Sequence, residues 1–137
     1  MNIISKRALT ITVFALSACA TVETAVVAEP GVEFSLALGK TAAINASGAR
    51  ITFKQVGEDS RCPVDVQCVW AGDAKIALTI SRSGAPDDAK VISLTPPNNE
   101  TTSGDLRIRF IGLAPVPRQS DSGKPRAYVA QLVVTRG

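Results

Sequence analysis

The residues best suited to chemistry lie together in residues 58–73, which read EDSRCPVDVQCVWAGD. This stretch holds Cys62, Cys68 and the chain's only tryptophan, Trp70, together with four carboxylates. The chain contains no histidine, which excludes Ser-His-Asp and Cys-His catalysis and the usual zinc and copper sites. Three uses of the cysteines remain: a structural disulfide, a redox-labile pair, or part of a metal site.

The spacing of the two cysteines favours a structural disulfide. Five residues separate Cys62 from Cys68, which differs from the C-x-x-C spacing of redox catalysts. A zinc site needs about four ligands, and the two thiolates supply only half of them. In an oxidising compartment, two thiols this close in sequence are expected to pair. We therefore predict a Cys62–Cys68 disulfide, no metal ion and no cofactor.

Trp70 follows Cys68 by two positions, so both side chains would point to the same face of an extended segment. We expect the indole to be buried against the disulfide. The alternative is an exposed aromatic ring that anchors a partner or stacks on a sugar.

The polar residues of the stretch are expected at its exposed rim. The four carboxylates follow no calcium-binding loop pattern, so we expect them to cap turns and to pair with a neighbour such as Arg61. The candidate interaction surface comprises Asp59, Arg61, Asp65, Gln67 and Trp70.

The segments around this stretch alternate apolar and polar residues with a period of two, which is typical of half-buried strands. Turns that contain glycine, proline or asparagine separate them, and no helical period is sustained. The alternation is clearest at residues 32–38, 51–54, 75–80, 106–110 and 127–135. We predict one all-β domain over residues 31–137, an antiparallel β-sandwich or small barrel of about seven strands with one disulfide.

The N-terminus has the three-part pattern of an export signal. Two positive charges in MNIISKR precede an apolar run of 11 residues, which is too short to span a bilayer. Leu16-Ser17-Ala18-Cys19 resembles the lipobox of bacterial lipoproteins, in which the cysteine is acylated and becomes the first residue. The resemblance implies a signal peptide over residues 1–18 and a lipidated tether over 19–30, and Ala20 after the cysteine implies the outer membrane. The alternative is a soluble secreted protein from which Cys19 has been removed.

The central stretch also carries a family resemblance. D-S-R-C-P, four further residues and C-V-W-A-G are similar to a block found in an uncharacterised family of small exported bacterial proteins and lipoproteins. The similarity extends to LRIRFIGLAPVPR and RAYVAQLVV, and so covers most of residues 32–135. It implies a disulfide-bearing β-domain on the exported side of the membrane, and it supplies no catalytic residues.

These features predict a non-enzymatic binding or interaction module in the cell envelope. The acylated Cys19 would hold it in the outer membrane facing the periplasm, where its partner is an envelope protein or a glycan. The formal net charge of +3 gives no reason to expect a nucleic-acid partner.

Two other functions make different demands on the central stretch. A periplasmic hydrolase inhibitor that presents the Cys62–Cys68 loop needs an exposed loop tip, Val64, Asp65, Val66 and Gln67. A purely structural staple would instead bury Val64 or Val66 with Trp70. An enzyme that relies on carboxylates alone would bring three of them to one cleft: Glu58, Asp65 and Asp73.

Overall fold

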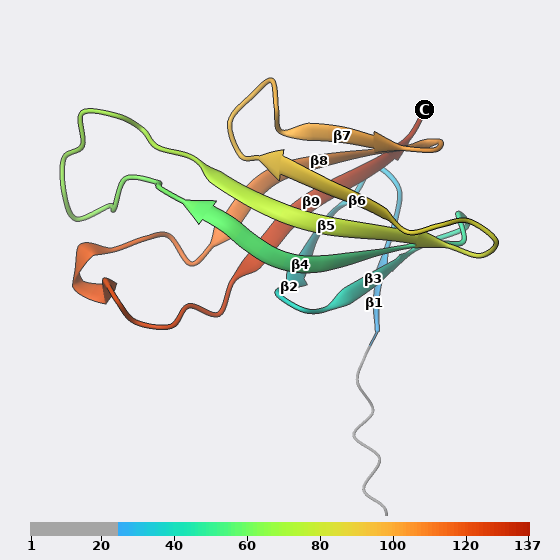
Figure 1. Ribbon diagram of the computed structural model, residues 1–137, viewed down its shortest axis with the longest axis horizontal. Coiled ribbons are helices and arrows are strands. Elements are labelled where there is room, and N and C mark those ends of the chain that lie inside the picture. The colour runs from blue at the N-terminus through green and yellow to red at the C-terminus, as the bar shows by residue number, and fades with distance from the viewer. Residues whose placement is uncertain (1–24) are drawn as a thin grey trace, which may run out of the picture.

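Two β-sheets packed face to face make up the protein in a computed structural model that describes residues 25–137 (Figure 1). The first sheet has the order β1 (Val26–Ala28), β3 (Thr41–Ile44), β4 (Ala49–Asp59), β5 (Ala74–Arg82) and β6 (Asp88–Ser93). The second has the order β2 (Glu33–Ala37), β9 (Val129–Arg136), β8 (Leu106–Ala114) and β7 (Glu100–Ser103). The prediction of an all-β sandwich is confirmed.

All neighbouring strands are antiparallel except β1, which lies parallel to β3 at the edge of the first sheet. β1 lies within the segment expected to be a tether, and Ala28 is buried in the core. The folded domain therefore begins before residue 31. The expected signal peptide, Cys19 and the first part of the tether lie outside the described residues. Within residues 25–137, no helix is both long enough and apolar enough to cross a membrane.

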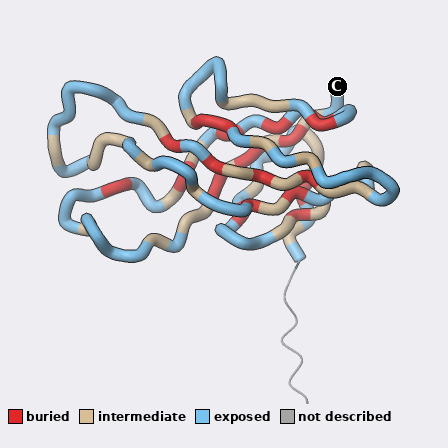
Figure 2. The backbone as a smooth tube through the Cα atoms, in the orientation of Figure 1, coloured by how far each residue is buried: buried red, intermediate tan, exposed pale blue. Residues whose placement is uncertain are grey.

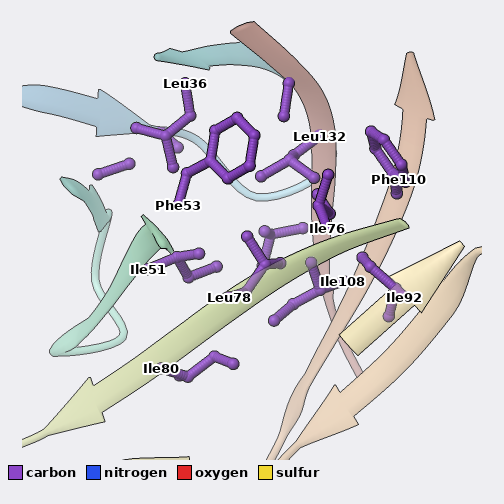
Figure 3. Packing of buried hydrophobic residues seen from close by; sticks show 14 of the residues in the cluster. Leu36, Ile51, Phe53, Ile76, Leu78, Ile80, Ile92, Ile108, Phe110 and Leu132 are labelled. Atoms are coloured by element: carbon purple, nitrogen blue, oxygen red, sulfur yellow. The ribbon is translucent and has the colours of Figure 1, made fainter. Parts of the chain in front are cut away.

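The core lies between the sheets and is built by alternate residues of the central strands. Figure 3 shows side chains from both sheets meeting in this layer, with Phe53 of β4 and Phe110 of β8 as its largest members. Their neighbours along each strand face outward, because successive side chains of a strand point to opposite faces. The buried face is therefore the apolar half of the alternation seen in the sequence.

Two long loops leave the same end of the sandwich, at the left of Figure 1. The first, residues 60–73, joins β4 to β5, and the second, residues 115–128, joins β8 to β9. Their backbone is mostly exposed in Figure 2, in contrast to the strands. Breaks in register at Phe53/Gln55, Val56/Glu58 and Phe110/Gly112 interrupt the strands that lead to this end, and such bulges bend and twist a strand.

Candidate functional site

The two long loops are bound to each other and form one structural unit, which we call the loop pair (residues 60–73 and 115–128). The amide of Val64 donates a hydrogen bond to the carbonyl oxygen of Pro117 at 3.0 Å, and Pro117 is buried. The carboxylate of Asp65 accepts a hydrogen bond from the amide of Gln119 at 2.8 Å, at the start of a short 3-10 helix, η1 (Gln119–Asp121). The first loop therefore supports the fold of the second.

The predicted disulfide is confirmed: Cys62 and Cys68 are bonded, with their Cα atoms 5.9 Å apart. The neck of the same loop is closed by backbone hydrogen bonds from Ser60 to Asp73 and from Cys62 to Ala71, at 2.8 and 3.1 Å. These bonds and the disulfide fix both ends of the segment that carries Trp70. The loop is consequently constrained although most of it is exposed.

Asp59 lies at the centre of a polar cluster that joins the end of β4 to the second loop. Its carboxylate receives two hydrogen bonds from Arg61, at 2.7 and 2.9 Å, and one each from Arg126 and the hydroxyl of Tyr128, both at 3.0 Å. Arg61 also donates to the carbonyl oxygens of Leu113 and Pro115. Every buried polar side-chain atom in the described residues has a hydrogen-bond partner.

The pKa of Asp59 reflects this setting. Burial opposes ionisation, but the hydrogen bonds from Arg61 and Tyr128 and the positive charge of Arg61 outweigh it, so the pKa is lowered. The pKa of Arg126 is raised, first by its hydrogen bond to Tyr128 and then by Asp59. Asp59 is therefore ionised at neutral pH and acts as an anchor for the cations around it.

The expectation that Asp59 and Arg61 belong to an exposed rim was wrong. Their side chains are only 6% and 13% exposed, because each satisfies the other and the loop backbone. Their partners Arg126 and Tyr128 were not predicted from the sequence. The available signal was that Tyr128 is the chain's only tyrosine and lies two positions after Arg126, where both can point to one face of an extended segment.

The expectation that Trp70 covers the disulfide was also wrong. Trp70 is 81% exposed and Val69 is 89% exposed. The reason is that residues 68–71 are not part of a strand: β5 begins only at Ala74, and the chain turns before it. The alternation that would have placed Trp70 beside Cys68 does not apply there.

The remaining residues of the expected rim, Asp65 and Gln67, are both exposed but differ in their hydrogen bonding. Gln67 is exposed. Asp65 is exposed as well, but its carboxylate is bound to the backbone of η1, and chiefly the hydrogen bond from the amide of Gln119 lowers its pKa. Among the loop-tip valines, Val64 is exposed and Val66 is half-buried. A staple with Val64 or Val66 buried together with Trp70 is thus not what this loop forms.

The carboxylates expected of an enzyme are each bound to other partners. Glu58 pairs with Lys75 at 2.8 Å, and Asp73 accepts hydrogen bonds from the amide and hydroxyl of Thr95, both at 3.0 Å. Asp65 caps η1 on the opposite loop. In the part of the chain that the structure describes, no three Cys, Asp or Glu side chains are grouped as metal ligands would be.

A cavity of about 390 Å³ lies within the second loop, where the chain folds back on itself. Its apolar walls come from two prolines and small side chains, and its charged groups are three cations and one carboxylate. The lining residues are Ala114, Pro115, Val116, Arg118, Asp121, Lys124, Pro125, Arg126 and Ala127. This cavity was not predicted from the sequence, although two runs that join proline to a basic residue, Val116-Pro117-Arg118 and Lys124-Pro125-Arg126, frame it.

Comparisons with known proteins identify no relative of the chain. No protein-family model matches the chain, and no curated protein and no solved structure matches it either.

Proposed function

We propose that the protein is a non-enzymatic binding module of the cell envelope that contacts a partner protein through the loop pair. In this proposal the acylated Cys19 anchors it in the outer membrane, facing the periplasm. The export-signal pattern, the lipobox resemblance and the disulfide support this location, because disulfides persist in oxidising compartments.

The observation that carries the proposal is the exposure of Val69 and Trp70 on a loop that is fixed at both ends. Exposed large apolar side chains that adjoin each other are typical of interaction sites, and tryptophan is enriched among the residues that dominate binding energy. A constrained loop loses little conformational entropy when it binds. The disulfide, the neck hydrogen bonds and the Asp59 cluster provide that constraint.

Site-specific photo-crosslinking tests the contact. A photo-reactive amino acid at position 69 is compared with the same residue at position 91, because Val91 is also an exposed valine, at 71%, but lies on β6. In intact cells we expect a discrete adduct with one envelope protein from position 69 and none from position 91. Val69→Asp should prevent the adduct from a neighbouring probe at Gln67, whereas Val91→Asp should not. Identical products from positions 69 and 91, or no adduct from position 69, contradict the proposal.

The membrane anchor is tested independently by mass spectrometry of the membrane fraction. We expect an acylated Cys19 as the first residue and release of the Cys19→Ser variant into the soluble fraction. A mature N-terminus at Thr21 without an acyl mass would contradict the anchor and favour a secreted protein.

A periplasmic hydrolase inhibitor is the second candidate, because Val64, Asp65 and Gln67 are exposed inside the disulfide ring. For this function the purified protein must reduce hydrolase activity in a periplasmic extract. Reduction of the disulfide or the Val64→Asp change should abolish that effect. Unchanged activity in the presence of the native protein removes this candidate.

A further inference from the structure

The cavity of the second loop has the dimensions and walls of a small ligand site. Its volume of about 390 Å³ falls within the range of about 300–1,000 Å³ that is usual for ligand pockets. Pro115, Val116, Pro125 and Ala127 give it apolar walls suited to a hydrocarbon stem. Binding of a ligand with an apolar part would therefore remove apolar surface of both the ligand and the cavity walls from water.

The three cations of the cavity differ in how far their charge is already used. Arg126 is bound to Asp59 and Tyr128, so its charge is largely taken up within the protein. Lys124 pairs with Asp121 at 3.0 Å, but both side chains are exposed, and such a pair contributes only about 0–1 kcal/mol. Lys124 can therefore exchange this partner for another anion at little cost.

Arg118 is the cation of the cavity whose charge is least compensated by neighbouring residues. Its guanidinium forms no hydrogen bond or ion pair with any residue of 25–137. Its positive charge acts on Asp65 only through longer-range electrostatic attraction. Asp65 in turn is satisfied by the amides of Gln119 and Ser120. Arg118 lines the cavity, and its guanidinium donors are therefore available to a bound anion.

We propose that this cavity binds a carboxylate carried on an apolar stem, with Arg118 as its principal contact and Lys124 as the second. A guanidinium matches a carboxylate with two parallel hydrogen bonds. Asp121 in the wall disfavours a doubly charged phosphate more than a singly charged carboxylate. The inference rests on the proposed function, which it deepens by naming the group through which the partner is recognised.

The same chemistry can come from the C-terminus of a partner chain or from a free aliphatic acid. Val116 lines the cavity and is exposed, and Val64 is hydrogen-bonded to the neighbouring Pro117. A chain end held in the cavity would therefore contact Val116, next to the point where the two loops are hydrogen-bonded to each other. A free acid would use the cavity alone.

Titration of the ¹⁵N-labelled purified protein by NMR tests the proposal. The probes are N-acetyl-glycyl-leucine, its C-terminal amide, and hexanoate. We expect the two acids to shift the amide signals of residues 114–127 and the uncharged amide to bind at least about tenfold more weakly, as expected when a charged hydrogen bond is lost. Tighter binding of the peptide acid than of hexanoate identifies a chain terminus, and the reverse order identifies a free acid.

Two arginine variants make the test specific. Arg118→Gln should weaken binding of the acids at least about tenfold, whereas Arg50→Gln, on the exposed face of β4, should leave it unchanged. Equal affinity for the acid and its amide, or equal affinity of the Arg118→Gln and native proteins, overturns the inference. If carboxylate binding is absent while the adduct from position 69 persists, the inference alone fails. If the acids bind and no adduct forms, the cavity stands and the partner-binding function fails.

Discussion

At the residue scale, burial at Asp59, Arg61 and Trp70 is the reverse of what was expected: the charged side chains expected at the surface are largely buried, and the tryptophan expected in the interior is exposed. Asp59 and Arg61 turn inward and hold the two loops together, while Trp70 turns outward. A buried ion pair persists only when its hydrogen bonds are satisfied, and Arg61 meets this condition by donating to Asp59 and to two backbone carbonyl oxygens. The side chains that remain for recognition are consequently Val69, Trp70 and the cations of the second loop.

The exposure of Trp70 predicts the fluorescence of the native protein, because this is its only tryptophan. We expect an emission maximum close to that of N-acetyl-tryptophanamide in water and little shift on unfolding in urea. Acrylamide should quench the native and unfolded proteins to a similar extent. A native spectrum shifted to shorter wavelength that moves on unfolding would restore a buried indole against the disulfide.

At the element scale, the loop that carries the disulfide depends on a close approach of its two ends. Gly72 has φ of +69°, and a Cβ atom there would lie 1.8 Å from the carbonyl oxygen of Ser60. The neck of the loop therefore requires glycine for two reasons, its backbone conformation and the space beside Ser60.

Gly72→Ala and Gly84→Ala separate these two requirements. Gly84 also has a positive φ, of +76°, but nothing lies within 4 Å of the position of its Cβ. Gly84→Ala should therefore lower the free energy of unfolding by about 1–2 kcal/mol through backbone strain alone. Gly72→Ala should cost about 1–3 kcal/mol more, because the neck must open to admit the methyl group. Equal losses in urea denaturation of the two variants would show that the contact with Ser60 carries no weight.

The elements also show how far the sequence could predict the fold. Alternation located β4, β5 and β8, because their inward positions carry large apolar side chains such as Phe53, Ile76 and Phe110. It did not locate β6, where Lys90 is paired with Leu78 and so shares its inward face near the edge of the sheet. It did not locate β1 either, since three residues are too few to show a period.

The candidate site was only partly predictable for a related reason. The disulfide could be predicted because its two cysteines are close in sequence. The Asp59 cluster was not, because Arg126 and Tyr128 lie 67 and 69 positions away from Asp59 and meet it only once both sheets have formed. The cavity could not be predicted from the sequence either, because it forms where the second loop folds back on itself.

At the scale of the whole molecule, ionised carboxylates tie the two sheets and their loops together. Hydrogen bonds and nearby cations lower the pKa values of several of them below the ordinary range, in each case because the folded state favours the charged form. The unfolded chain then binds protons more readily than the folded protein. Stability from these groups is present above their unfolded pKa values and is lost as the pH falls through the lower folded values.

Asp59→Asn tests this linkage at its most buried member. Near pH 7 the variant should unfold with a free energy about 3 kcal/mol lower than the native protein, because Arg61 and Arg126 lose the charge that holds them. As the pH falls below the ordinary pKa of an unfolded aspartate, about 4, the unfolded native chain binds a proton at Asp59 while the folded protein keeps it ionised, so the difference between the two proteins should shrink. Asp87→Asn is the matched control, since Asp87 is exposed and has no hydrogen-bond or ion-pair partner among residues 25–137. Its denaturation curves should follow those of the native protein from about pH 7 to pH 3. A constant difference between Asp59→Asn and the native protein across this range would mean that the charge of Asp59 contributes nothing to holding the loop pair on the sandwich.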